Sequence, residues 1–323
     1  MNTTQAQLGA VLAAGGPELT RLLESTESRL AEVAEAHGAE LAGHATDTLL
    51  AGGKRLRPML VFLCANHGDD RLVSAAAAVE LLHMASLVHD DVLDRAALRR
   101  GRPTVFARGG RVAATATGDL LFSRAFAELA STGDPDAVRA LSQASSALAR
   151  GELMQRADAW RADVTPERYL ERCRLKTASL FEASCRLGAL FGERPALAGA
   201  LGRFGEQIGL AFQMLDDVLD VSGPAERTGK PRGTDLLDGT VTLPLILALR
   251  TDPGLARPDR SLGPDGASEI CDRIIATGAL AQARGEALGH VAEAKAEVEA
   301  LELPAEPKRA LELVADGVVE RYA

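Results

Sequence analysis

Aromatic residues are scarce in this sequence: one Trp, two Tyr and eight Phe account for 3% of its 323 residues. Strand-forming residues are also sparse and fall mostly at helical spacing, whereas Ala and Leu dominate the hydrophobic fraction of 46%. Ala and Leu are strong helix formers, and no Ser/Gly-rich linker divides the chain. We therefore predict one all-α domain over residues 1–323, with residues 1–17 as a flexible N-terminal segment.

Paired cysteines, an excess of positive charge and long apolar runs are all missing. The four cysteines (Cys64, Cys173, Cys185 and Cys271) form no C-x-x-C pair, and we predict reduced core thiols in a cytoplasmic protein. The net charge of −9 argues against binding to nucleic acid and to anionic membranes. Since the N-terminus lacks a basic segment and no apolar run reaches membrane-spanning length, we predict neither a signal peptide nor a membrane span.

What the sequence does contain is a carboxylate cluster at the end of a long helix predicted for residues 71–96. Asp90, Asp91 and Asp94 fall within an arc of about 100° on a helical wheel, after the mostly apolar run Ser86-Leu87-Val88-His89. Three carboxylates on one arc repel one another. Hard cations make sense of the arrangement, because Mg²⁺ is typically held by one or two carboxylates plus substrate phosphates.

The pattern recurs at Asp216-Asp217-Val218-Leu219-Asp220, with the same spacing. One copy would also suit a solvated acidic helix end, but two copies, each after apolar helix, favour two facing acidic patches bridged by metal and a polyanion. Arg and Lys side chains bind phosphate directly, and such residues cluster in the intervening loops. They are Lys54, Arg55, Arg57, Arg99, Arg100, Arg102 and Lys230. We therefore predict a substrate that carries diphosphate groups.

The other elements are predicted from hydrophobic periodicity and from Gly and Pro positions. A helix is expected to begin at Pro58 and to stop near residues 67–70, and residues 99–103 and 222–240 are expected to be loops. Thr165 is expected to cap the helix that follows it. The remaining helices are expected at about 18–50, 107–131, 135–158, 166–191, 195–221, 243–249, 267–302 and 305–322.

Five motifs follow one another in a recognisable order. They are Gly52-Gly53-Lys54-Arg55-Leu56-Arg57-Pro58, then His89-Asp90-Asp91-Val92-Leu93-Asp94 with Arg99-Arg100-Gly101-Arg102-Pro103-Thr104, then Lys176-Thr177, Phe212-Gln213-Met214-Leu215-Asp216-Asp217-Val218-Leu219-Asp220, and Gly229-Lys230 through Asp235. With these motifs, the sequence from about residue 20 to Arg321 resembles the trans-isoprenyl (polyprenyl) diphosphate synthases. The resemblance implies the isoprenoid synthase fold, an antiparallel helical bundle around a deep central cavity, and a homodimer.

The resemblance also implies a role for each matching residue. Metal ligation falls to Asp90, Asp94 and Asp216, with Asp91, Asp217 and Asp220 in supporting positions, and about three Mg²⁺ ions per active site are implied, with Mn²⁺ as a substitute. The allylic diphosphate would be held by Arg99, Lys176 and Lys230. Isopentenyl diphosphate would be held by Lys54, Arg57, His83 and Arg100. The residues near the developing allylic cation would be Lys176, Thr177 and Gln213, while we assign Arg55 and Arg102 to the surface.

Several of these residues also have a purely structural interpretation. His83 on a buried helix could be a core histidine, although it shares the helical stripe of Asp90. Lys54 and Arg57 could form an ordinary basic helix start, and Gln213 could serve a core hydrogen bond. One departure from the family pattern stands at Thr240, where many relatives carry Lys after Asp238-Gly239. It puts the affinity for the allylic substrate in doubt rather than the reaction class.

The implied activity is the Mg-dependent head-to-tail condensation of isopentenyl diphosphate with an allylic diphosphate. A terpene cyclase is a rival, but it needs no second diphosphate site, and aromatic residues that would stabilise cyclising cations are scarce. A regulatory subunit of a heteromeric synthase would be expected to have lost acidic residues, whereas this chain keeps all six. The catalytic subunit of such a synthase remains an alternative.

Product length is predicted from the helix that precedes the first motif. The growing hydrocarbon would extend from Asp90 back along the helix, past Ala85 and Ser86 and then past Leu82 and Val79 deeper in the pocket. The helical wheel places Ser86 and Val79 on the Asp90 stripe, whereas Ala85 is placed on the pocket wall by the resemblance. Small side chains one turn before the motif leave room for a long product, of roughly C30 to C50, with a short-chain farnesyl or geranylgeranyl synthase as the alternative. Because such a product is a long hydrocarbon, the protein is allowed a peripheral contact with a membrane when it releases the product.

Overall fold

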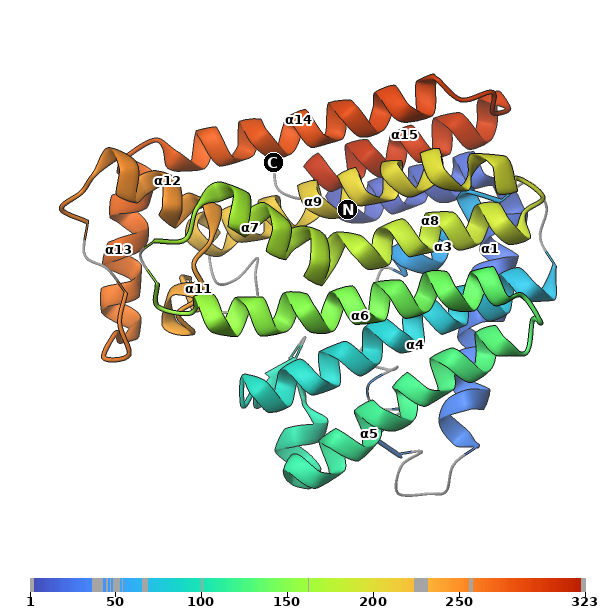
Figure 1. The fold of residues 1–323 in the computed structure, drawn as a ribbon, viewed down its shortest axis with the longest axis horizontal. Coiled ribbons are helices and arrows are strands. Elements are labelled where there is room, and N and C mark those ends of the chain that lie inside the picture. The colour runs from blue at the N-terminus through green and yellow to red at the C-terminus, as the bar shows by residue number, and fades with distance from the viewer. Residues whose placement is uncertain are drawn as a thin grey trace. The chain divides into compact units, whose positions relative to one another are not determined.

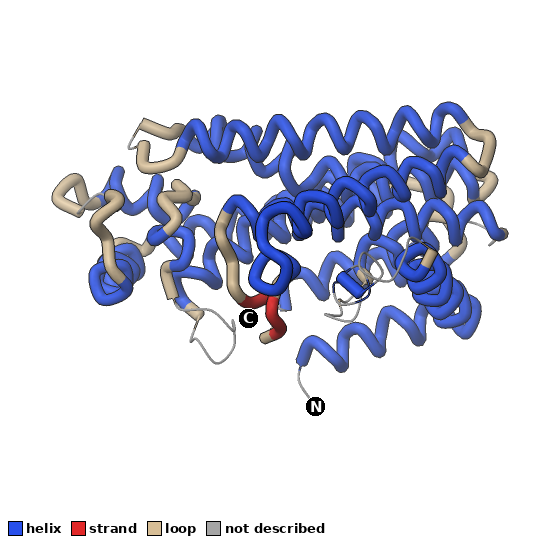
Figure 2. The backbone as a smooth tube through the Cα atoms, turned by 90° about the horizontal axis from the view of Figure 1, so that it is seen from below, coloured by secondary structure: helices blue, strands red, loops and turns tan. Residues whose placement is uncertain are grey.

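The computed structural model describes residues 3–36, 43, 44, 46, 48, 53, 55–65, 69–99, 101–161, 163–223, 232–255 and 258–320. Helices make up almost all of this part of the chain, as Figure 1 shows. One short antiparallel pair of strands is the only sheet among the described residues (Figure 2). The predicted all-α fold class is therefore confirmed.

The described helices range from four to 33 residues in length. They are α1 (Thr3–Glu35), α3 (Leu56–Leu63), α4 (Asp70–Leu93), α5 (Val105–Ala130), α6 (Pro135–Asp158), α7 (Pro166–Cys173), α8 (Ser179–Phe191), α9 (Ala198–Ser222), α11 (Thr234–Leu237), α12 (Leu243–Thr251), α13 (Pro264–Ala276), α14 (Ala279–Glu299) and α15 (Ala305–Glu320). A π-helical turn (Arg174–Ala178) joins α7 to α8, and a 3₁₀ turn (Pro195–Leu197) precedes α9. The strands are β1 (Leu98–Arg99) and β2 (Arg102–Pro103).

The chain divides into two compact units. The first unit comprises Met1–Ser145, Leu180–Gly205 and Glu297–Val314, and the second comprises Ser146–Ser179, Glu206–Ala296 and Ala315–Ala323. The first aspartate motif therefore belongs to the first unit, and the second motif belongs to the second unit.

In the first unit, α4 is the helix on which the predicted site residues depend. The carboxylate of Asp69 accepts hydrogen bonds from the backbone N–H groups of Arg71 and Leu72, which satisfies free donors at the start of α4. The run Ala75–Ala78 is fully buried, because its small side chains let neighbouring helices approach closely. Helices α1, α3 and α5 all pack against α4, and α5 follows it over most of its length (Figure 1).

By length and composition, α4 could also cross a membrane, since an 18-residue window of Asp70–Leu93 has a mean hydropathy of 1.5. However, 67% of that window is buried inside the structure. The core helix of a water-soluble protein meets the same criterion, so the criterion alone is weak evidence for a span.

In the second unit, two loops are joined near the start of α12. The backbone of Trp160 lies in the left-handed region (φ 66°), and its N–H donates to the carbonyl of Gly239 at 2.9 Å. Gly239 also has a positive φ (76°), and a Cβ there would stand 2.2 Å from the Trp160 ring. Because only glycine fits this contact, the Asp238-Gly239-Thr240 loop is held against residue 160.

The element boundaries differ from the predicted ones where tertiary contacts decide the backbone. Helix α1 begins at Thr3, inside the predicted flexible segment, and bends at Gly16, whose φ is 72°. The predicted helix over 166–191 contains the π-helical turn, and the predicted helix over 267–302 is broken between α13 and α14. All four cysteines are free and buried, which confirms their assignment to the core.

Candidate functional site

The first aspartate motif stands where α4 ends. Asp90 and Asp91 lie in the last helical turn, and Asp94 is the residue after the helix, with its N–H donating to the Asp90 carbonyl at 2.8 Å. Asp90 is half-buried and Asp94 is exposed, whereas only 4% of Asp91 is exposed. The two outer carboxylates of the motif are therefore accessible to a ligand, and the middle one is not.

The partner of the middle carboxylate is an arginine of the short hairpin. Arg99 donates from two guanidinium nitrogens to Asp91 Oδ1, each at 2.8 Å, and 27% of its side chain stays exposed. The chain is turned back toward α4 by Thr104, whose hydroxyl donates to the Ala96 carbonyl at 2.6 Å. Arg99, predicted to hold diphosphate, thus lies beside the motif with part of its surface open to solvent.

The basic segment at the start of α3 supplies two arginines with different surroundings. The Arg57 guanidinium lies 4.5 Å from the centroid of the Phe181 ring, a cation–π contact with a fully buried side chain. Arg55 was predicted to be a surface residue, and that prediction is wrong. Its side chain is only 11% exposed and pairs with Glu80 at 2.6 Å and with Glu27. Burial opposes its charge, but these carboxylates raise the pKa of Arg55.

The second motif lies near the C-terminal end of α9. Asp216 is exposed, Asp220 is half-buried, and only 4% of Asp217 is exposed. Asp220 is tied to the chain that returns after it, because its carboxylate accepts the N–H of Asp235 at 3.2 Å and its carbonyl accepts the N–H of Gly233 at 2.9 Å. The arrangement of accessible outer and buried middle carboxylates is thus the same in both motifs.

The buried carboxylate of the second motif accepts two hydrogen bonds from neutral groups. The Tyr169 hydroxyl donates to Asp217 Oδ2 at 2.7 Å, and the Gln213 amide donates to Oδ1 at 2.8 Å. The other end of that amide accepts the Thr177 hydroxyl at 2.7 Å.

Burial raises the pKa of Asp217 to about 7, and the neighbouring Asp216 charge adds to the rise. The hydrogen bonds from Tyr169 and Gln213 and the charge of Arg172 oppose it. Burial and the Asp217 charge also raise the pKa of Tyr169 far above its ordinary range. The tyrosine therefore stays a hydroxyl donor at any working pH.

Lys176 and Thr177 lie in the π-helical turn, a type of bulge that often marks functional sites. The ammonium group of Lys176 forms an ion pair with Glu152 of α6. Burial of Glu152 acts against ionisation, but the Lys176 charge lowers its pKa overall. Gly151 permits the close approach, because a Cβ there would stand 2.5 Å from the Lys176 backbone nitrogen. The second unit thus links Thr177 and Gln213 to the buried Asp217 carboxylate, while the neighbouring Lys176 pairs with Glu152.

Other predicted residues are not placed in an open site. Val79, Leu82 and Ala85 are buried with at most 1% of their surface exposed, and only Ser86 keeps a larger accessible part. The Ser86 hydroxyl donates to the His83 carbonyl at 2.7 Å, and His83 itself is half-buried. Three further predicted phosphate-binding residues lie outside the described part of the chain: Lys54, Arg100 and Lys230.

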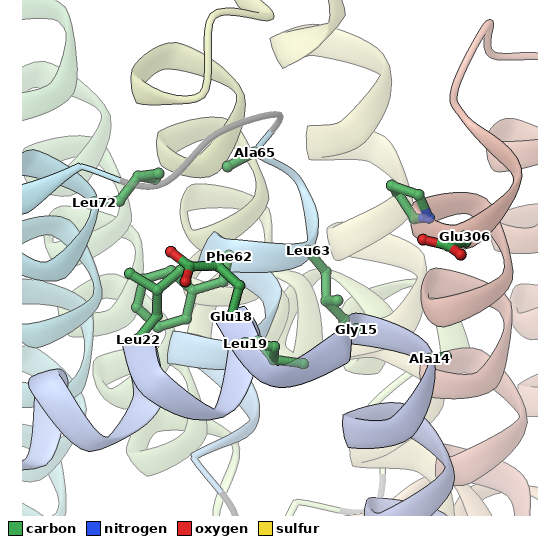
Figure 3. Close-up of a pocket in the computed structure, with 11 residues that line it drawn as sticks. Ala14, Gly15, Glu18, Leu19, Leu22, Phe62, Leu63, Ala65, Leu72 and Glu306 are labelled. Atoms are coloured by element: carbon green, nitrogen blue, oxygen red, sulfur yellow. The ribbon is translucent and has the colours of Figure 1, made fainter.

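A pocket of about 440 Å³ lies in the first unit, at the other end of α4 (Figure 3). Its wall includes Leu19 and Leu22 of α1, Phe62 of α3 and Leu72 of α4. Leu72 precedes Asp90 by 18 residues, or about 27 Å along a helix. None of the residues predicted for the site lines this pocket, so the pocket is not the candidate site.

The carboxylates suit a hard cation that is shared with a substrate. The accessible outer residues Asp90, Asp94, Asp216 and Asp220 offer oxygen ligands only, as Mg²⁺ prefers. Among the described residues, no three His, Cys, Asp or Glu side chains form a complete metal-binding group. That is compatible with Mg²⁺, which is usually bound through one or two carboxylates and completed by phosphate oxygens and water.

Sequence reasoning missed the residues that hold the site residues in place. Tyr169, Glu152 and Phe181 each contact a predicted site residue through one side-chain interaction. The rarity of tyrosine in this chain was the one available signal, because a buried tyrosine usually has a hydrogen-bond partner. That partner lies 48 residues away, at a distance that helical periodicity does not predict.

Comparison with known proteins gives the family of this chain. The model of the polyprenyl synthetase family matches residues 39–268, more than half of the sequence. Heptaprenyl diphosphate synthase component 2 of Geobacillus stearothermophilus is 43% identical over 247 residues, which cover 75% of this chain and 77% of that protein. A short chain isoprenyl diphosphate synthase of Methanothermobacter thermautotrophicus is 36% identical, over 94% of this chain and 97% of that protein.

A solved structure agrees with this result. The polyprenyl synthase of Caulobacter crescentus CB15, crystallised in complex with calcium and isoprenyl diphosphate, is similar with a TM-score of 0.86 and 32% identity, and the match covers 98% of each chain. The fold therefore belongs to a known architecture, and the chain is a prenyltransferase of the polyprenyl synthetase family, the trans-isoprenyl diphosphate synthases.

Proposed function

We propose that this chain condenses isopentenyl diphosphate with an allylic diphosphate, head to tail, in an Mg²⁺-dependent reaction that yields a long-chain all-trans polyprenyl diphosphate. The observation that supports it best is the common arrangement of the two motifs. In each, the outer carboxylates are accessible and the middle one is held by protein donors. This arrangement leaves the outer oxygens accessible, which supports binding of a metal–diphosphate substrate.

In the proposed reaction, the bond from the allylic carbon to the diphosphate oxygen breaks, and the isopentenyl double bond supplies the electrons of the new carbon–carbon bond. One proton is then lost to the departing diphosphate. Mg²⁺, bound by Asp90, Asp94 and Asp216 with the other three aspartates in support, would supply the positive charge that makes diphosphate a better leaving group.

The chain's own groups then orient and stabilise the reactants. Lys176 and Arg99 bind phosphate oxygens, and Lys230 completes that set. Arg57 and His83, together with Lys54 and Arg100, hold isopentenyl diphosphate. Thr177 and Gln213 present oxygen atoms toward the developing cation, whose charge they stabilise over a short distance. Apolar side chains exclude the water that would otherwise quench it.

The test is incubation of the purified chain with farnesyl diphosphate and labelled isopentenyl diphosphate, followed by chromatography of the dephosphorylated products. We expect turnover with Mg²⁺ or Mn²⁺ and none with excess chelator. Full turnover in chelator would refute the two-motif mechanism. Products that stop at farnesyl or geranylgeranyl length would refute the long-chain product and favour the short-chain alternative, the activity named for the Methanothermobacter relative.

Product length can be tested on α4 itself. Ala85→Phe should shorten the product by several isoprene units if the hydrocarbon runs past this residue. Ala85 is completely buried, so the larger ring also costs about 1–3 kcal/mol of stability. Ser86→Phe is the matched variant, because Ser86 is partly accessible. An unchanged product length in both variants would mean that the hydrocarbon follows another path.

A second candidate is the catalytic subunit of a heteromeric synthase. It is favoured by the relative from Geobacillus stearothermophilus, which is named component 2 of its enzyme. Turnover by the purified chain alone, as a homodimer, supports the first proposal. Turnover only after addition of a partner subunit supports the second. A cytoplasmic location, with membrane contact limited to product release, is consistent with either form.

A further inference from the structure

We propose that Tyr169 is a positioning residue of the allylic site, which fixes Asp217 and, through it, the direction in which the Thr177 hydroxyl points. The inference rests on the proposed prenyl transfer and assigns a role to a residue outside the family motifs. Tyr169 has no exposed surface, so it acts on the substrate only through the residues it contacts.

The ring of Tyr169 is itself held in place. The Arg172 guanidinium lies 5.4 Å from the ring centroid, and one of its nitrogens donates to the Val241 carbonyl at 2.5 Å. Thr165 caps the start of α7 by accepting the Arg168 N–H at 3.3 Å. The Tyr169 ring is therefore held rigidly, and its hydroxyl is already directed at Asp217 without further ordering of the side chain.

These hydrogen bonds then determine which atoms of Gln213 and Thr177 act as donors and which as acceptors. Both oxygens of the Asp217 carboxylate are acceptors, one for Tyr169 and one for Gln213. Gln213 must turn its NH₂ group toward Asp217, which leaves its carbonyl oxygen for Thr177. The single proton of the Thr177 hydroxyl is used in that bond. Its oxygen lone pairs are left for another neighbour, which suits a developing cation and not a phosphate oxygen.

Tyr169 also sets the rotation of α9. Residues 216 and 217 are separated by about 100° around a helix, so a helix whose Asp217 is fixed inward must turn Asp216 outward, as observed. Loss of the tyrosine hydroxyl would leave one oxygen of a buried carboxylate without its donor. The carboxylate would then be free to move, and the side chains of Asp216 and Gln213 would no longer be held in one orientation.

The test begins with three single variants whose kinetics are compared. Tyr169→Phe removes one oxygen atom without changing the ring. We expect kcat to fall about tenfold, with the KM for isopentenyl diphosphate unchanged, because no contact in the described structure joins Tyr169 to Arg57 or His83, two of the residues predicted for that substrate. Thr177→Val removes the hydroxyl at the end of the relay, and Thr177→Ser keeps it.

The decisive comparison is between the two double variants. With Ser at position 177, Tyr169→Phe should again lower kcat about tenfold, whereas with Val the further loss should be clearly smaller, because only the part that acts through Asp216 remains and interacting residues are not additive. Ser184→Ala is the control: in the described part of the chain, its buried hydroxyl donates to the Leu180 carbonyl in α8, at 2.7 Å. It should leave kcat unchanged and combine additively with both Thr177 variants.

The outcomes separate this inference from the proposed function. A wild-type chain that is inactive both alone and with an added partner subunit refutes prenyl transfer and the positioning role with it. An active wild type with normal kcat in Tyr169→Phe, or with equal losses on the Ser and Val backgrounds, overturns the positioning role alone. Loss of the helical circular dichroism signal in Tyr169→Phe would assign the residue a purely structural role and would also overturn it.

Discussion

The two aspartate motifs have the same five-residue pattern, but the protein neutralises their middle carboxylates differently. Asp91 accepts hydrogen bonds from the Arg99 guanidinium, whereas Asp217 accepts them from a hydroxyl and an amide. Neutral donors replace part of the lost hydration but add no positive charge. The pKa of Asp217 accordingly rises to about 7. Although the spacing in sequence is identical, the middle carboxylate of the first motif is paired with an arginine, whereas that of the second motif is buried with neutral donors, which makes its ionisation unfavourable.

The backbone around the motifs differs as well. Helix α4 stops at the first motif, and the hairpin behind it supplies the arginine. Helix α9 continues beyond the second motif to Ser222, and the support comes from α7 and from the chain around Asp235. The first motif is therefore supported by residues that follow it closely in sequence, and the second by residues from distant parts of the chain.

The largest expected effect tests whether the motifs are equivalent in catalysis. Asp90→Ala and Asp216→Ala should each lower kcat at least about 100-fold, because each removes one strong electrostatic stabiliser of the leaving group. Steady-state kinetics at saturating Mg²⁺ measure it. Asp136→Ala is the control, since this exposed carboxylate pairs only with Arg139 in the described structure. A large loss in one variant and a normal rate in the other would show that one motif carries the chemistry.

A smaller effect should distinguish the residues that bind isopentenyl diphosphate from those that bind the allylic substrate. Arg57→Ala in the first unit should raise the KM for isopentenyl diphosphate about tenfold, the value of one charge-assisted hydrogen bond. Lys176→Ala in the second unit should raise the KM for the allylic substrate by a similar factor. Arg139→Ala, at an exposed ion pair, is the control. Reversed effects of the two variants would mean that the substrate sites are exchanged.

The fold was largely predictable because its signals are local. Helix α6 occupies the predicted residues 135–158, and α7 begins after Thr165 as the Thr-Pro cap indicates. Apolar periodicity and helix caps act within a few residues of each other, so the sequence displays them directly. The same holds for the spacing of the aspartates, which a helical wheel reproduces.

The supporting contacts were not predictable because they join distant segments. The left-handed backbone of Arg55 goes with ion pairs to Glu27 and Glu80, 28 and 25 residues away. The π-helical turn at Lys176 is accommodated by Gly151 in another helix. Neither a charge pattern nor a propensity reports such a contact, and Arg55 was consequently assigned to the surface. Which residues carry the chemistry could be proposed, but how they are held could not.

The next effect concerns stability, where the two middle carboxylates should behave differently. Asp91→Asn leaves the Arg99 guanidinium without its counter-charge in a largely buried position. We expect a loss of about 1–3 kcal/mol in the free energy of unfolding. Asp217→Asn keeps an oxygen acceptor for Tyr169 or Gln213 and removes a buried charge, so the change should stay below about 1 kcal/mol. Urea unfolding at pH 7 without metal measures both, and equal losses would contradict the proposed electrostatic difference.

The last effect is the pH dependence of that difference. The Asp217 carboxyl has a folded-state pKa of about 7, above the ordinary value of 3.8. Between these values the folded chain binds more protons than the unfolded chain, so this group's contribution to stability falls as the pH rises and becomes constant above about 7. Asparagine does not titrate. In metal-free buffer, the stability of Asp217→Asn relative to the wild type should therefore increase from pH 5 to pH 8. A constant difference for Asp217→Asn would show that Tyr169 and Gln213 stabilise the charged carboxylate as well as an arginine does, and the two motifs would then be electrostatically alike.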